Sequence, residues 1–146
     1  MELKCHYIDQ FKMFSDRYHY YNSECLILLD EITKIDQDIK FHNTEIIKHQ
    51  KKRIEYNRKC VKYTKLLLSH ELFEKEKQTY FDNIVKYRIE MGKHYVEKRS
   101  NENQIEILTK KRNDLESRMQ KLKKNAENFF IEMNRIKFII NNNFFN

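Results

Sequence analysis

Proline and tryptophan are absent from the 146-residue chain, and glycine occurs once, at Gly92. Compact β and α/β folds of this length need more turn residues than that, so we exclude both classes. The three cysteines, Cys5, Cys25 and Cys60, are too widely spaced for a disulfide framework or a CxxC motif. The longest apolar run, residues 25–29, is far too short to cross a membrane, and the first ten residues have no apolar signal region. The sequence therefore predicts a soluble, intracellular, all-α protein.

A repeat of apolar residues dominates the last third of the chain. At alternating steps of three and four from residue 105 to residue 140, only Arg112 is not apolar. Steps that average 3.5 residues keep one face of a helix against a partner as the two helices supercoil. This spacing predicts a partner-helix seam, with Ala126 inside it, formed by Ile105, Leu108, Leu115, Met119, Leu122, Phe129, Met133, Ile136 and Ile140.

A second repeat of the same kind begins at Tyr7 and continues to His70. It is apolar as far as Ile39 and becomes polar between His42 and Arg53. Beside that polar part, a line one residue further along is apolar, and we expect it to take over the contact. Its members are Ile47, Ile54, Val61 and Leu68. Three apolar residues between 26 and 29 widen the seam, which suggests burial by more than one helix.

We expect residues 1–140 to form one elongated coiled-coil unit, as a continuous rod or as a helical hairpin or bundle. A single helix of this length would extend about 220 Å and could not bury its own seam. Possible breaks lie at 22–23, at 68–73, where the repeat slips in phase, and at 99–103. In the last of these, Asn101 and Gln104 have the spacing of a helix-capping box, although an uninterrupted polar helix explains them equally well. The Asn- and Phe-rich tail, 141–146, is expected to fray.

Charge is distributed unevenly along the chain. The net charge is +7, but residues 1–50 carry −3 and residues 51–146 carry +10. The basic part begins with a run that could bind anions. Its members are Lys51, Lys52, Arg58, Lys59, Lys62 and Lys65. This run could contact nucleic acid or an anionic membrane, or it could simply solubilise a rod that faces the acidic N-terminal third.

Residues with catalytic or metal-binding spacing are lacking, so we expect no enzyme activity, no cofactor, no metal and no small-molecule substrate. His42 and His49 lie seven residues apart on one line of the helix. They could face each other across a dimer as a pH-sensitive patch, or act as polar residues that set the register.

One segment resembles the N-terminal helical region of a synaptonemal-complex central-element protein. The matching residues are Glu74, Lys75, Lys77, Tyr80, Asp82, Ile84, Tyr87, Tyr95 and Lys98. The chain lacks the Trp-Lys-Pro found within that family's segment. The resemblance implies a meiotic scaffold in the nucleus that pairs with another coiled-coil protein.

The sequence thus favours a non-enzymatic structural subunit that pairs with itself or with another coiled-coil protein. The alternative is a basic helical adaptor that binds nucleic acid or an anionic membrane.

Overall fold

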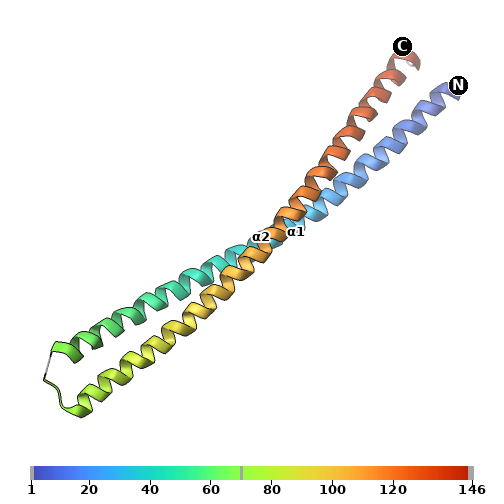
Figure 1. Ribbon diagram of the computed structural model, residues 1–146. Helices are drawn as coiled ribbons and strands as arrows, with labels where there is room; N and C mark the ends of the chain where they lie inside the picture. Colours follow the sequence, from blue (N-terminus) through green and yellow to red (C-terminus); the bar gives the residue numbers. More distant parts are fainter. Residues whose placement is uncertain (1, 70, 145–146) are drawn as a thin grey trace. The chain divides into compact units, whose positions relative to one another are not determined.

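The computed structural model describes residues 2–69 and 71–144, which form two long helices and contain no strand. Helix α1 spans Glu2–Ser69 and helix α2 spans Glu74–Phe144. Residues 71–73 precede α2, whose first turn includes a hydrogen bond from the Lys77 amide to the Phe73 carbonyl, at 3.1 Å. Figure 1 shows the two helices running in opposite directions. The predicted all-α class is confirmed, in the form of a helical hairpin.

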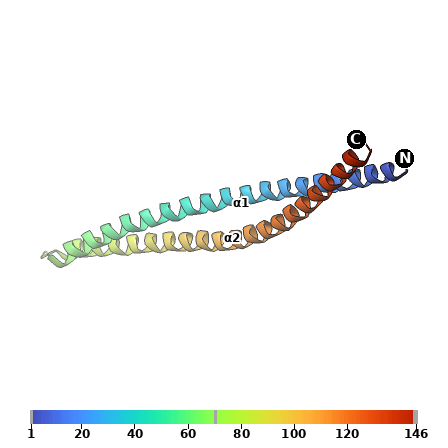
Figure 2. The ribbon, with the colours of Figure 1, turned by 90° about the horizontal axis from the view of Figure 1, so that it is seen from above.

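The chain divides into two compact units, and each pairs one part of α1 with one part of α2. Unit 1 contains Met1–Asp36 and Lys110–Asn146, and unit 2 contains Gln37–Thr109. The second view, in Figure 2, again shows the two helices side by side within each unit. The repeat in the last third of the chain therefore packs mainly against the early part of the second repeat, and the later part of the second repeat packs against the first half of α2.

Aliphatic and aromatic side chains from both helices fill unit 1. Leu28 and Ile32 of α1 are buried, as are Leu115 and Ile136 of α2. Nearer the chain ends, the ring of Phe129 lies 5.6 Å from the ring of Tyr21. Because apolar side chains meet along the whole unit, burial of this surface is the main force that holds the two helices together here.

Aromatic rings take over this role in unit 2, where few aliphatic residues are available. Six rings alternate between the helices with neighbouring centroids 5.0–6.0 Å apart. In order along the unit they belong to Tyr80, Tyr63, Tyr87, Tyr56, His94 and His49. Offset or tilted ring pairs each contribute about 0.5–1.5 kcal/mol beyond their burial, so this zipper compensates for the scarcity of aliphatic contacts.

Two of the predicted breaks are wrong, because α1 continues through residues 22–23 and α2 through residues 99–103. Asn101 does not cap a helix. Its amide donates to the Glu97 carbonyl one turn earlier, at 2.8 Å, and its Oδ1 contacts His42 Nδ1 of α1, at 2.6 Å. The third predicted break, at 68–73, includes the segment where α1 ends and α2 begins.

The expectation of a frayed tail is also wrong for residues 141–144, which belong to α2. Phe144 lies against Tyr7, with ring centroids 6.1 Å apart, and this contact holds the last turn of α2 on α1. Residues 145 and 146 lie outside the described ranges.

Candidate interaction surfaces

The seam predicted in the last third of the chain lies against α1 in the same chain. Each of its members is buried or half-buried, and these are Ile105, Leu108, Leu115, Met119, Leu122, Phe129, Met133, Ile136 and Ile140, with Ala126 and Arg112. Met119 offers its carbonyl oxygen to Cys25 Sγ of α1, at 3.8 Å. The surface that the sequence assigns to a partner helix is therefore occupied within the hairpin.

Arg112, the charged residue in that seam, is held by two carboxylates. Its Nε donates to Asp36 of α1 at 2.6 Å, and its Nη1 donates to Glu116 of α2 at 2.8 Å. The hydrogen bond to Asp36 raises the pKa of Arg112 above its ordinary value, and the charges of both acids act in the same direction. The side chain is about one-third exposed, so the pair contributes little to stability but fixes the register of the two helices.

Unit 2 has a polar seam built from histidines. His49 Nδ1 lies 2.7 Å from His94 Nδ1, and Glu45 lies 3.7 Å from His49 Nε2. A nitrogen–nitrogen contact this short requires one ring to donate a proton and the other to accept it. The hypothesis that His42 and His49 face each other across a dimer is therefore wrong for this hairpin, because each is paired with α2 of its own chain.

The apolar line that we expected to replace this polar seam lies outside it. Ile47, Ile54, Val61 and Leu68 are 52%, 54%, 44% and 81% exposed. The polar and aromatic residues stay in the seam because they find partners there, so this expectation is wrong. The result is a row of large apolar side chains facing solvent at steps of seven residues.

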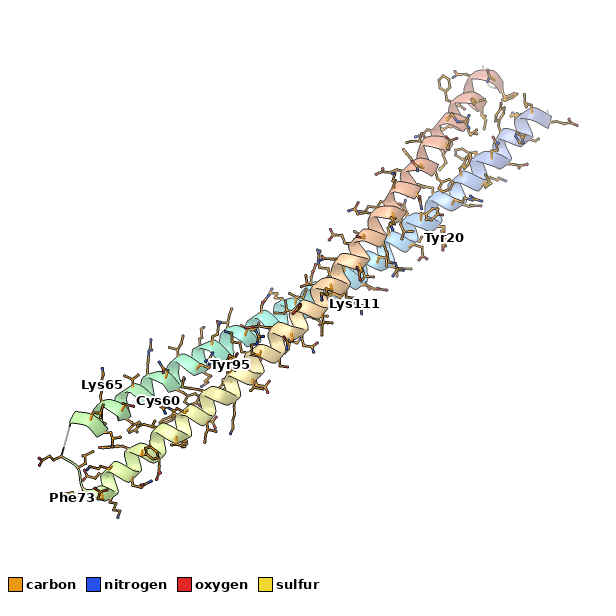
Figure 3. All side chains as sticks on the ribbon, viewed as in Figure 1. Tyr20, Cys60, Lys65, Phe73, Tyr95 and Lys111 are labelled. Carbon is orange, nitrogen blue, oxygen red and sulfur yellow. The ribbon has the colours of Figure 1, made fainter. Side chains whose placement is uncertain are left out.

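Three of the basic residues follow a second outward row beside that apolar row. Lys51, Arg58 and Lys65 also lie at steps of seven, and all three are exposed. Figure 3 shows Lys65 on the side of α1 that faces away from α2. For the other three predicted anion-binding residues, the contacts are with Glu55 and Tyr63. Lys52 and Lys59 each lie 3.6 Å from Glu55, and the Lys62 ammonium is 5.8 Å from the Tyr63 ring centroid.

Helix α2 also exposes large apolar side chains at steps of seven or their multiples. Ile89, Val96, Ile131 and Phe138 are each more than half exposed. Groups of this kind at regular helical spacing favour contact with further helices. This row is not apparent from the main apolar repeats, which mark only the most apolar line of each helix.

Other kinds of site find less support in residues 2–69 and 71–144. No cluster of three or more His, Cys, Asp or Glu side chains there could hold a metal ion. Cys25 and Cys60 are buried, and each lies within 4 Å of a carbonyl oxygen of α2. Neither helix is long and apolar enough, over its described residues, to span a membrane.

Comparison with known proteins adds no assignment: no protein-family model, curated protein or solved structure matches the chain.

Proposed function

We propose that the chain is a non-enzymatic assembly subunit, a helical hairpin that pairs with copies of itself or with another coiled-coil protein. The hairpin uses its seam internally, so assembly depends on the outward faces. A place in a meiotic, synaptonemal-complex-like scaffold in the nucleus stays a prediction that rests on the resemblance of residues 74–98.

The observation that carries this proposal is the exposure of large apolar side chains in rows along both helices. Ile47, Ile54 and Val61 form such a row on α1 within unit 2, and Ile131 and Phe138 form a shorter one on α2 within unit 1. Leaving such rows in water is unfavourable, because each of these side chains is 44–69% exposed and could still gain roughly half of the about 1.5–3 kcal/mol that full burial provides. A further helix laid along either row would recover part of that energy.

A second candidate function rests on the basic row beside the apolar row of α1. Lys51, Arg58 and Lys65 next to Ile54 and Val61 give α1 a basic amphipathic surface. Such a surface suits an anionic membrane, and its charges suit the phosphates of nucleic acid.

Sedimentation equilibrium tests the first candidate. The average mass should rise above the monomer value of 18.2 kDa as concentration increases. Replacing Ile89, Val96, Ile131 and Phe138 by Gln should lower that mass toward the monomer, because Gln removes apolar surface but favours helix. Circular dichroism should show unchanged helix content.

A control variant changes four exposed, uncharged polar residues of α2 to Gln and should assemble like the wild type. Its positions are Ser100, Asn103, Ser117 and Asn128. A wild-type chain that stays monomeric at every concentration, yet binds DNA or anionic vesicles at physiological ionic strength, would contradict the assembly function and support the adaptor.

A further inference from the structure

A groove runs between α1 and α2 inside unit 2. It consists of two adjoining hollows that share Asn57 and Met91 in their linings. These linings come from residues 50–65 of α1 and 88–98 of α2, all of which belong to unit 2. At 1.5 Å per residue, the α1 wall is about 23 Å long, or about four turns of helix. We call this surface the unit 2 groove.

The described residues that line the unit 2 groove include bases but no acid. Three bases line the first hollow and two line the second, and they are Arg53, Arg58 and Lys98, then Lys65 and Arg88. Arg58 and Arg88 are exposed and make no ion pair with any described carboxylate. Lys98 differs, since its ammonium lies 3.6 Å from Glu102. The groove therefore has an excess of positive charge, which attracts an acidic ligand.

Arg53 is the base that most lacks a partner. Its side chain is half-buried, and its Nε is buried without a hydrogen-bond partner among the described residues. Its guanidinium carbon lies 5.0 Å from the centroid of the Tyr95 ring. Arg112 of unit 1 shows the contrast, because the carboxylates of Asp36 and Glu116 both hold it. Since Arg53 lines the first hollow, a carboxylate bound there supplies the acidic partner that this guanidinium lacks.

Apolar side chains lie between the bases of the groove. Ile54 and Val61 are exposed there, and Met91 is half-buried. The hydrated phosphates of nucleic acid would leave these apolar side chains uncovered. An amphipathic helix covers them with its apolar stripe and carries charged residues on either side of that stripe. The lining therefore favours a helix with acidic flanks over nucleic acid.

We propose that the unit 2 groove binds an acidic amphipathic helix of another protein, as the third helix of a small bundle. The apolar stripe of that helix covers Ile54, Val61 and Met91, and its carboxylates lie beside Arg58 and Arg88. Exposed ion pairs add little affinity, so they select an acidic partner, while the apolar side chains supply burial. This inference rests on the assembly function and names the class of its partner.

Two synthetic peptides of about 21 residues, or three heptads, test the proposal with the full chain. Both have Leu along one stripe, and the positions beside the stripe are Glu in one peptide and Lys in the other. Like charges on both flanks keep each peptide from pairing with itself. Fluorescence anisotropy of the labelled peptides should show the Glu peptide binding at least about tenfold more tightly than the Lys peptide. Raising the salt concentration should narrow this difference.

Charge reversal in the groove should reverse that preference. A variant with Arg58→Glu and Arg88→Glu should bind the Lys peptide more tightly than the Glu peptide. A control variant with Lys48→Glu and Lys86→Glu makes the same change of charge at exposed positions of unit 2 outside the groove, and it should keep the wild-type preference. The proposal is overturned if the wild type does not prefer the Glu peptide, or if both variants lose that preference equally.

Two further outcomes separate this proposal from the assembly function. If the wild type self-associates and the four-Gln α2 variant does not, but the Glu peptide fails to bind, the assembly function stands and the groove proposal is wrong. If the wild type is monomeric and fails to bind the Glu peptide, yet binds a DNA duplex through Arg58 and Arg88, both are wrong.

Discussion

The histidine pair of unit 2 shows how a polar residue can belong to a helix seam. His49 and His94 share one N–H···N contact at 2.7 Å, and Tyr56 stacks on His94 with ring centroids 5.7 Å apart. Each of the two ring nitrogens therefore depends on the other for its hydrogen bond inside the seam.

Removing one partner of the pair should consequently destabilise unit 2. His94→Ala leaves the ring nitrogen of His49 without its partner in the half-buried seam, and it should lower the free energy of unfolding by about 1–3 kcal/mol. His94→Gln should cost less, because an amide both donates and accepts a hydrogen bond. Urea unfolding followed by circular dichroism measures both losses. Equal losses in the two variants would exclude the mechanism.

At the scale of the helix, the seam of unit 1 accounts for pairing of α1 with α2. Leu115 is buried and Leu122 is half-buried on the face of α2 toward α1. Changing both to Asp places unpaired carboxylates in the seam, which should lower the free energy of unfolding of unit 1 by more than about 3 kcal/mol. Urea unfolding followed by circular dichroism measures the effect.

Ser117 and Gln120 provide a matched control on the same turns of α2, because both are exposed. Changing them to Asp introduces the same two carboxylates in water and should cost less than about 1 kcal/mol. If the two double variants lost similar amounts of unfolding free energy, the face of α2 that contacts α1 would not be the one that contains Leu115 and Leu122.

Periodicity alone located most of the seam, because every helix position at steps of three and four must face the same side. Even polar members such as His42 and Arg53 are half-buried on that line. The prediction was wrong where the more hydrophobic line of residues was preferred to the line that continues the helical spacing. Ile47 lies in water, whereas its neighbour Ile46 is half-buried in the seam. Ring stacking between the helices keeps the polar line in the seam. Each stacked pair joins residues that are far apart in the chain, so the sequence pattern of one helix does not reveal it.

The ends of the helices were harder to predict for a related reason. Asn101 has the sequence signature of a cap, but His42 on the other helix engages its side chain. A local pattern cannot reveal a partner that is 59 residues away. The pairing of His49 with His94, in place of a second copy, was hidden in the same way.

For the whole molecule, the decisive feature is that the hydrophobic seam closes inside each chain. An intermolecular seam would instead leave the single chain with no hydrophobic core of its own. The two arrangements differ in whether α1 and α2 of one chain are neighbours.

Distance measurement by pulsed electron resonance on a doubly labelled chain tests this most directly. Lys34→Cys and Lys111→Cys place labels at exposed sites of unit 1, near the contact between Asp36 and Arg112, after Cys5, Cys25 and Cys60 are replaced by Ala. Figure 3 shows the position of Lys111 on α2. We predict a short distance, set by a helix separation of about 8–10 Å plus the label arms, that persists when labelled chains are diluted with excess unlabelled protein. Loss of that distance on dilution would show pairing between chains and contradict the hairpin.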